Sequence, residues 1–374
     1  MTYRLPFIRP VFPSADLISV DIQEIVDANW YTNFGPKERA FSSEIAARFG
    51  ADYHAVTFNN ATIALMAALH VTLGRGDGTR FVVVPSFTFA AGPQAIEWAG
   101  YRPFFVDIDP VTLQPALGGL SEALASRPGQ IAGVLLCNTF GMGNPDIDAW
   151  EALAREAGIP VVVDSAAGFG SEYPGGRMVG TGGHCEVFSF HATKPFAIGE
   201  GGAVVTRDGD FAARLKEFTN FGFHASEGAV ALGLNGKLQE ISAAIGLRQL
   251  RAFDEVKRAR QSVAARYREL LDERISVPPA LETSSVCFAT VLMPDNVTRD
   301  RARARLIEAG VEARSYYSPP VHRQPHFTTA TRSADLHVTE DVVDRVISVP
   351  VYSDMADEEI ALIAGILSTE ITSI

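Results

Sequence analysis

The sequence contains few lysines, few cysteines and no long apolar run. Of its 32 lysines and arginines, 5 are lysines and 27 are arginines, so a lysine in an unusual setting stands out. The cysteines, Cys137, Cys185 and Cys287, are widely spaced and form neither a metal motif nor a disulfide framework. No apolar run is long enough to span a bilayer, and residues 1–7 lack the apolar segment of a signal peptide. We therefore expect a cytoplasmic protein that holds no metal and contacts no membrane.

Length and charge narrow the classes of function. With 374 residues, 47% of them hydrophobic and 20% charged, the chain is expected to form a globular protein of two domains that share an interface. The formal net charge of −12 argues against a nucleic-acid binder, which needs a basic surface. A local anion site is still compatible with this charge, because backbone N–H groups and a few side chains are enough to build one.

Short apolar runs alternate with helix-like segments between about residues 55 and 206. The runs predicted to be strands are Phe81–Val84, Phe104–Asp107, Ile131–Cys137, Pro160–Asp164, Glu186–Phe190 and Ala203–Thr206. Amphipathic stretches such as Ala61–Leu73 and Ile147–Ala157 are predicted to be helices. Strands that are apolar on both faces and separated by helices indicate an α/β fold with a largely parallel sheet covered on both sides. Such sheets bind ligands at the carboxyl ends of their strands.

The last third of the chain has a different pattern. A long helical pattern from Lys237 to about Arg260 is predicted to link two domains. A smaller α+β domain is predicted from two strands and two helices: Ile275–Val277, Val286–Met293, Arg299–Ala309 and Asp357–Leu367. The expected division is a large domain of residues 1–250 and a small domain of residues 251–374, with roughly the first 35 residues packed on the body.

Lys194 lies in a stretch that is aromatic, small and turn-rich, FSFHATKPFAIGEGG (188–202), with no other lysine or arginine. A lysine in a partly dry pocket loses proton affinity and becomes a nucleophile that can form a Schiff base. The ordinary alternative is a surface lysine at the junction of a strand and a loop. Taken alone, the residue does not decide between these two interpretations.

Further features bring polar or aromatic groups to the same expected edge of the sheet. Asn60 and Thr62 open a helix after a short strand and can offer N–H groups and a hydroxyl to a phosphate. Phe89 follows a strand end, where a flat ring can stack on a cofactor. Asp164 ends a buried strand and needs a partner such as a pyridinium N–H. Each feature also has an ordinary explanation, as a helix cap, a core ring or a turn-capping carboxylate.

Taken together and in this order, these features resemble the pyridoxal-phosphate sugar aminotransferases of the DegT/DnrJ/EryC1/StrS family. The matching blocks cover nearly the whole chain: WYTNFGP (30–36), NNAT (59–62), PSFTF (85–89), FVDID (105–109), SFHATK (189–194), GEGG (199–202), NGKLQE (235–240) and YYSP (316–319) with His322. The lysine block with its GEGG is the most specific. The resemblance implies the aspartate aminotransferase-like (type I) fold, in which helices flank a mostly parallel mixed sheet and a smaller carboxyl-terminal α+β domain follows.

The resemblance also implies the cofactor, pyridoxal 5′-phosphate, and a role for each matched residue. Lys194 would form the Schiff base and move the proton, Asp164 would pair with the pyridine nitrogen, and Phe89 would stack on the ring. The implied phosphate ligands are Ala61, Thr62, Ser189 and, from the neighbouring subunit, Asn235. The active unit would then be a homodimer with shared active sites. The residues implied to face the nucleotide sugar are Thr32, Tyr317 and His322.

The sequence departs from the family pattern at two points. Many members carry Asp-Ala-Ala-Gln, whose glutamine contacts the ring hydroxyl, whereas this chain has Asp164-Ser165-Ala166-Ala167. Ala167 cannot make that contact, so His191, Asn138 or a water would replace it, or the hydroxyl is held differently. The usual Gly-Asp before the lysine strand is Gly183-His184 here, and the sequence offers no explanation for this change.

The implied reaction transfers an amino group from L-glutamate to a keto-sugar linked to a nucleotide diphosphate. The motifs are most similar to those of members that aminate C4 of dTDP-4-keto-6-deoxyglucose, although similar members act at C3. Relatives that dehydrate sugars replace the lysine with histidine, so Lys194 argues against dehydration. A cofactor-binding sensor or scaffold without turnover is a further alternative. The intact set of Lys194, Asp164 and Ser189 argues against it, while Ala167 leaves it open.

Overall fold

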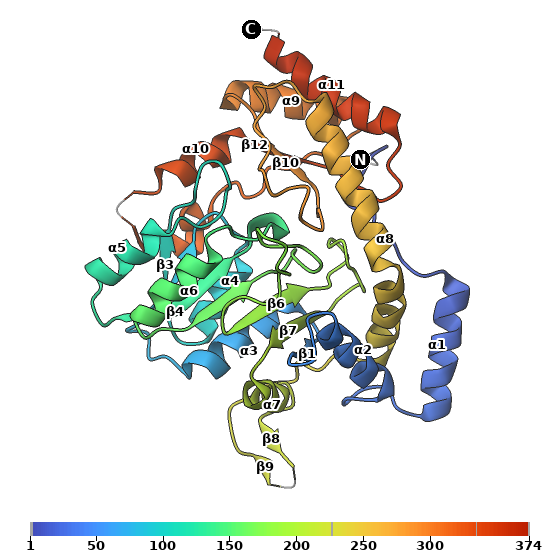
Figure 1. The fold of residues 1–374 in the computed structure, drawn as a ribbon, viewed down its shortest axis with the longest axis vertical. Coiled ribbons are helices and arrows are strands. Elements are labelled where there is room, and N and C mark those ends of the chain that lie inside the picture. Colours follow the sequence, from blue (N-terminus) through green and yellow to red (C-terminus); the bar gives the residue numbers. More distant parts are fainter. Residues whose placement is uncertain (1–2, 226, 334, 373–374) are drawn as a thin grey trace.

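The computed structural model describes residues 3–225, 227–333 and 335–372. An eight-stranded mixed sheet lies between two layers of helices, and a smaller part built mainly from the end of the chain lies beside it (Figure 1). In spatial order the strands are β1 (His54–Phe58), β7 (Gly202–Thr206), β6 (Cys185–Ser189), β5 (Val161–Asp164), β4 (Ile131–Cys137), β2 (Phe81–Pro85), β3 (Arg102–Val106) and β11 (Thr331–Arg332).

The strands from β6 to β11 run parallel, whereas β7 is antiparallel to both of its neighbours, β6 and β1. The expectation of a mixed, mostly parallel sheet is therefore confirmed. The register of the strands determines which of their last residues lie side by side. Cys137 of β4 lies beside Asp164 of β5, and Ser189 of β6 lies beside Gly202 of β7. Residues that end successive strands are thus brought to one edge of the sheet.

Helices cover both faces of the sheet, as its apolar strands require. On one face, α3 (Ala61–Leu73), α4 (Ala91–Trp98) and α7 (Gly209–Phe218) bury Leu65, Ile96 and Leu215 against alternate strand residues such as Val82 and Leu135. On the other face lie α2 (Pro36–Ala47), α5 (Gly118–Ser126), α6 (Ile147–Glu156) and α8 (Glu240–Leu270). Their buried side chains, such as Trp150 and Phe253, pack on the intervening strand residues.

The smaller part has its own hydrophobic cluster. It contains the two-stranded antiparallel sheet of β10 (Ala289–Leu292) and β12 (Val346–Val349) and the helices α9 (Asn296–Glu308), α10 (His337–Arg345) and α11 (Asp357–Thr372). Leu5 and Phe7 join the same cluster, and the Leu5 N–H donates to the Gly310 carbonyl at 3.0 Å. Across the described residues, no helix combines the length and apolar character needed to cross a membrane.

Two predictions for the end of the chain need correction. Ile275–Val277 is not a strand, because only Ser276 forms a bridge, with Leu292. The next two residues are prolines, which have no N–H to continue a ladder. The predicted strand Val286–Met293 is shorter, beginning at Ala289. The proposed domain division stays a prediction: α8 crosses residue 250, and β11 returns to the large sheet.

Gly246 allows α8 to approach α2 closely, and this contact can be tested. A Cβ built at Gly246 would lie 2.5 Å from ring carbons of Phe41, which is fully buried. We expect Gly246→Ala to lower the free energy of unfolding by about 1–3 kcal/mol through overpacking. Chemical denaturation of the wild type and the variant measures this difference in the free energy of unfolding.

Gly365→Ala in α11 is the matched control. A Cβ there meets no atom within 4 Å, so alanine should raise the stability by about 0.5–1 kcal/mol. Equal stability of the two variants would contradict the close α2–α8 packing.

Candidate active site

A cavity of about 580 Å³ opens at the carboxyl ends of the parallel strands. Its walls come from the start of α3, from the segments after β2, β4, β5 and β6, and from residues 7–8, 287–288 and 316–317. Most of the sequence-predicted site residues line it: Ala61, Thr62, Phe89, Asp164, Ser189, Lys194 and Tyr317. The chain thus gathers them where a parallel sheet is expected to bind its ligand.

Lys194 lies in the loop after β6, and backbone hydrogen bonds hold this loop. The Lys194 N–H donates to the His191 carbonyl at 2.9 Å, and the Ala192 N–H donates to the Gly199 carbonyl at 2.8 Å. The side chain is half-buried. Within the described part of the chain, its amine has neither a hydrogen-bond acceptor nor an ion-pair partner. Such an amine is free to react or to carry a proton.

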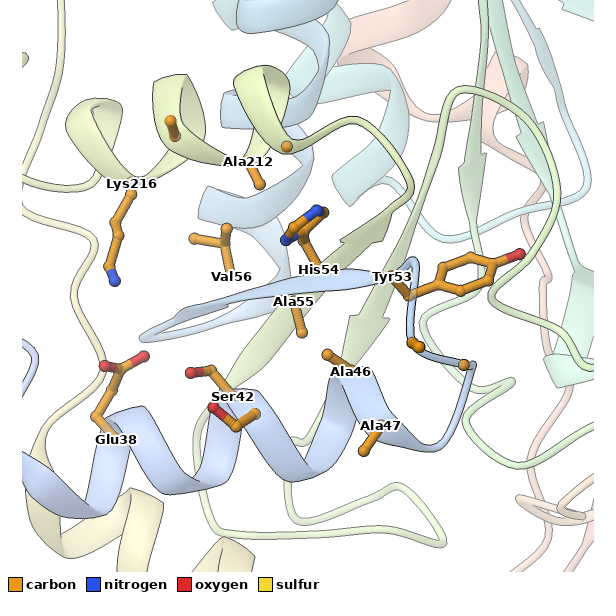
Figure 2. A pocket seen from close by; sticks show the side chains of 15 residues that line it. Glu38, Ser42, Ala46, Ala47, Tyr53, His54, Ala55, Val56, Ala212 and Lys216 are labelled. Carbon is orange, nitrogen blue, oxygen red and sulfur yellow. The ribbon is translucent and has the colours of Figure 1, made fainter.

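The other four lysines are placed differently. Three of them have acceptors for their amines: Lys37, Lys237 and Lys257. The fourth, Lys216, lies at a second cavity, of about 480 Å³, between α2, β1 and α7 (Figure 2). Mostly small side chains line that cavity, and none of the sequence-predicted site residues borders it. Lys194 is therefore the lysine that the fold places at the strand ends.

Asp164 ends β5 and is only 7% exposed. Its Oδ1 accepts a hydrogen bond from the Ala166 N–H at 3.0 Å. Burial raises the pKa of the Asp164 carboxyl above its ordinary value, while the Ala166 N–H and the charge of Lys194 act in the opposite direction. A buried carboxylate with so few partners favours a ligand that brings an N–H or a positive charge, and a protonated pyridine nitrogen is such a group.

The start of α3 forms a cradle for an anion. The Asn60 side chain caps the helix by accepting from the Ile63 N–H at 2.9 Å, and the described structure gives the Ala61 and Thr62 N–H groups no acceptor. A Cβ at Gly202 would lie 2.9 Å from the Ala61 nitrogen, so glycine is needed for the helix to approach the sheet. Ser189, beside Gly202, adds a hydroxyl. These groups suit a phosphate.

Phe89 is a large apolar side chain with 63% of its surface exposed, although it borders the cavity. Its neighbour Thr88 is buried. A flat ring held open to a cavity is suited to stack on a planar ligand. The buried carboxylate, the anion cradle, the open ring and the free amine together fit pyridoxal 5′-phosphate, which has a ring nitrogen, a phosphate, a flat face and an aldehyde.

A polar network behind Asp164 was not foreseen from the sequence. Glu186, fully buried in β6, accepts from the hydroxyls of Ser165 and Tyr173, the latter at 2.9 Å. The Gly182 N–H also donates to it, at 2.6 Å. Burial raises the pKa of the Glu186 carboxyl, and these donors oppose the shift. The available signal was a charged residue within an otherwise apolar strand, which requires buried partners.

This network bears on the missing glutamine at Ala167. The Asn138 amide, which borders the cavity, donates to Ser165 at 2.8 Å and to Tyr173 at 3.0 Å. Both of its N–H groups are therefore engaged. His191 also borders the cavity, and its Nδ1 lies 2.9 Å from the Thr193 hydroxyl. Of the two side chains considered as replacements, His191 has a ring nitrogen without a hydrogen bond in the described structure: its Nε2 lies 3.6 Å from a carboxylate oxygen of Glu200.

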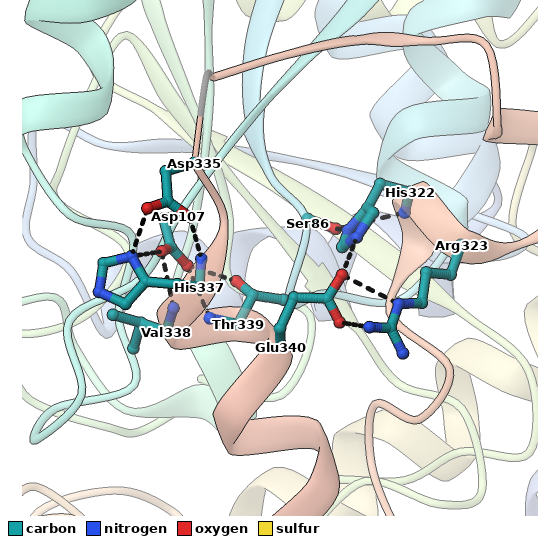
Figure 3. Close-up of polar contacts among 9 residues, drawn as sticks. All are labelled: Ser86, Asp107, His322, Arg323, Asp335, His337, Val338, Thr339 and Glu340. Atoms are coloured by element: carbon teal, nitrogen blue, oxygen red, sulfur yellow. Dashed lines mark hydrogen bonds and ion pairs between the residues drawn. The ribbon is translucent and has the colours of Figure 1, made fainter.

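Three predicted residues lie outside the cavity. Thr32 and Asn235 are exposed, so they are free to contact another molecule. His322 is different, because its side chain is 2% exposed. Its Nδ1 lies 2.6 Å from the Ser86 hydroxyl and its Nε2 lies 2.7 Å from Glu340 (Figure 3). This ring lies inside the protein and does not border the cavity.

Comparisons with known proteins agree with this geometry. Residues 15–368 match the model of the DegT/DnrJ/EryC1/StrS aminotransferase family. Protein Rv3402c of Mycobacterium tuberculosis is 44% identical over 98% of this chain and 90% of its own. The dTDP-4-dehydro-2,3,6-trideoxy-D-glucose 4-aminotransferase of Saccharopolyspora spinosa is 30% identical over 95% of this chain and 94% of its own.

Among solved structures, a putative PLP-dependent aminotransferase from Bacillus cereus superposes with a TM-score of 0.90 at 31% identity, over 97% of this chain and 99% of its own. The helix-flanked mixed sheet is therefore the type I fold that the sequence predicted. The chain belongs to the DegT/DnrJ/EryC1/StrS aminotransferase family and is a pyridoxal-phosphate-dependent enzyme.

Proposed function

We propose that the protein transfers the amino group of L-glutamate to C4 of a nucleotide-diphosphate-linked keto-sugar, dTDP-4-keto-6-deoxyglucose or a close analogue. One observation carries the proposal: an unpaired lysine amine and a buried carboxylate share a cavity with an anion cradle. Bound pyridoxal 5′-phosphate would supply an aldehyde that takes up amino groups and a ring that accepts electrons when the α-proton leaves.

The residues of this chain would then hold the cofactor and move the proton, each in a separate role. The α3 N–H groups of Ala61 and Thr62 and the Ser189 hydroxyl hold the phosphate. Asp164 keeps a proton at the ring nitrogen, and Phe89 fixes the plane of the ring. The Lys194 amine holds the cofactor and, when released, takes the proton from the donor carbon and returns it.

The sugar side of the proposal depends on the rim of the cavity. Burial raises the pKa of the Tyr317 hydroxyl well above its ordinary value, so this group stays neutral and can donate to a sugar oxygen. The relative from S. spinosa is named for C4 transfer on a dTDP-linked sugar, which supports C4. A relative from Pseudomonas aeruginosa with the same 30% identity is named for a 3-oxo sugar, so transfer to C3 is the alternative. Thr32, exposed on the segment before α2, is proposed as a further sugar or nucleotide contact.

We also propose that the active sites are shared within a homodimer. Asn235, predicted to reach the partner's cofactor phosphate, is exposed. The nearby hairpin of β8 (Phe223–His224) and β9 (Gly228–Ala229) extends away from the body (Figure 1). On and beside it, four large apolar side chains are 46–55% exposed: Phe221, Phe223, Val230 and Leu232. Exposed apolar groups clustered in this way favour a protein partner.

Lys194→Ala tests the central assignment. After addition of pyridoxal 5′-phosphate, L-glutamate should remove the visible absorbance band of the wild-type protein and release 2-oxoglutarate. Without the amine that moves the proton, the variant should lose this reaction by about 10²–10⁴-fold. Absorbance spectra and a 2-oxoglutarate assay measure it. Lys216→Ala, at the second cavity, is the control and should behave as wild type. A wild-type protein with no visible band would refute the proposed function.

Asp164→Asn keeps the shape of the side chain and removes its charge. Cofactor should still bind, but the glutamate reaction should slow by about 10²–10³-fold, because a neutral amide does not keep the ring nitrogen protonated. Stopped-flow absorbance at saturating glutamate gives this rate. An unchanged rate would mean that another group holds the proton.

Subunit mixing tests the shared site. Lys194→Ala and Asn235→Asp are each expected to be inactive, the second because its charge repels a phosphate. A refolded 1:1 mixture should regain about a quarter of wild-type activity, because half of the dimers are mixed and each has one intact site.

The control for this experiment is a mixture of Lys194→Ala with Asp164→Asn. Both residues line one chain's cavity, so no intact site forms and no activity should return. Equal recovery in the two mixtures would argue against sharing through Asn235.

A further inference from the structure

Ser86, His322 and Glu340 form a hydrogen-bonded relay beside the active site, in which Glu340 is half-buried. Ser86 directly follows β2, and both it and His322 are buried. The His322 ring bridges the Ser86 hydroxyl at 2.6 Å and the Glu340 carboxylate at 2.7 Å, and the His322 N–H donates to the same hydroxyl at 3.2 Å. Arg323 binds Glu340 from the solvent side (Figure 3).

The direction of each hydrogen bond follows from the acceptor at one end. Glu340, paired with Arg323, is a carboxylate and only accepts. Nε2 of His322 must then carry a proton, and in the neutral tautomer with this arrangement Nδ1 accepts from the Ser86 hydroxyl. In that tautomer, each ring nitrogen of His322 has a partner, and the Ser86 hydroxyl both donates to Nδ1 and accepts from the His322 N–H. Breaking one of these contacts leaves a buried group unpaired.

A second tie lies on the adjacent strand. Asp107, just after β3, accepts from the N–H groups of Val338 and Thr339 at 3.0 and 2.7 Å and from the Thr339 hydroxyl at 2.6 Å. These residues form the first turn of α10, which also carries Glu340. Two neighbouring strand ends are thus fastened to one helix turn, one directly and one through His322 (Figure 3).

The relay holds two segments that line the cavity. On the β2 side, the turn that begins with Ser86 continues to Thr88 and Phe89. On the other side, the chain reaches His322 directly after the segment that holds Tyr317. Phe87 packs edge-on against the Tyr317 ring with centroids 5.5 Å apart. The contact between Ser86 and His322 therefore helps to tie the turn that carries Phe89 to the segment that carries Tyr317, together with the Val321 N–H bond to the Ser86 carbonyl.

The same three residues have the connectivity of a hydrolase triad, but their location excludes that role. Ser86 has no exposed surface, and its backbone carbonyl is covered by the Val321 N–H at 3.1 Å. None of the three residues borders either cavity. A nucleophile needs space for the atom it attacks, whereas a buried and saturated relay fixes the position of what it joins.

We propose that His322 is a positioning residue of the active site, which acts through Ser86 to hold the Phe89 ring in place over the cofactor. The inference rests on the proposed function only for the effect of the relay on cofactor binding and catalysis; the contacts of the relay themselves do not depend on it. The relay orients the ring, and the ring orients the cofactor, without contact between His322 and the sugar.

Three variants and one control test the relay in the full-length protein with cofactor. Ser86→Ala and His322→Ala remove the relay. His322→Asn keeps an amide at the place of Nδ1 and should restore much of the wild-type affinity for the cofactor. His326→Ala is the control, because His326 is exposed, its ring bonds to Glu97 and packs on Phe327, and it contacts none of the relay residues in the described structure. In the first two variants, the affinity for pyridoxal 5′-phosphate should fall about fivefold, as expected for one buried hydrogen bond.

A spectroscopic signal separates positioning from simple stability. The visible circular dichroism per bound cofactor, measured at saturation, should fall at least about twofold in Ser86→Ala and His322→Ala. It should stay at the wild-type value in His326→Ala. If the signal is unchanged while the sugar KM rises only in the His322 variants, His322 contacts the sugar and the proposal is wrong.

Hydrogen exchange separates failure of the relay from failure of the proposed function. In the protein without cofactor, backbone N–H groups of residues 86–90 should exchange faster in Ser86→Ala than in His326→Ala. This result supports the relay even if the wild-type protein forms no visible band, which would refute only the aminotransferase proposal. Equal exchange in the two variants would overturn the relay.

Discussion

The alignment of parallel strand ends is the constraint on which the site depends. Because β4, β5 and β6 run in the same direction and in register, Asn138, Asp164 and the lysine loop leave the sheet at one edge. The antiparallel β7 then places Gly202 beside Ser189, and the lack of a side chain there lets α3 direct its first N–H groups to the same edge. A carboxylate, an amine and an anion cradle come together because each lies at, or shortly after, the end of a strand at this edge, or at the start of α3.

The charges in the cavity limit what can bind there. Among the described residues that border it, Lys194 is the sole lysine or arginine, whereas Asp164 and Glu200 are acidic. A ligand with a diphosphate must therefore place most of its charge outside the floor of the cavity, toward the rim or a second subunit. Glu186 adds a buried acidic group behind the floor, but its donors hold it within the network of Ser165 and Tyr173. The floor thus suits the cofactor, and the rim must recognise the nucleotide.

Apolar runs of the central sheet could be predicted from the sequence because burial on both faces leaves a continuous signal. Lys194 stood out because lysine is rare here, but its assignment came from the resemblance of the surrounding motifs, since the residue taken alone did not decide between a Schiff-base lysine and a surface lysine. Short elements such as β11 carry no such signal, and Ile275–Val277 has the composition of a strand although the prolines that follow prevent a ladder. For His322, the sequence could not show the direction of the ring, which is set by Ser86 and Glu340, 236 and 18 residues away in the chain.

The two ties to α10 also bear on how one fold accepts different sugars. Ser86 and Asp107 follow neighbouring strands, so the ties join the first turn of α10 to the edge of the sheet where the cavity opens. If the floor and Phe89 hold the cofactor as proposed, the choice between C3 and C4 would depend on which sugar carbon the rim places at the amino group that the cofactor carries, within reach of Lys194. C3 and C4 are adjacent in the sugar ring, so the two binding positions differ by a small shift of the sugar. One side chain at the rim is enough to favour one of these positions. Thr32 and Tyr317, rather than Asp164 or Ser189, are therefore the positions where substrate choice is expected to be decided.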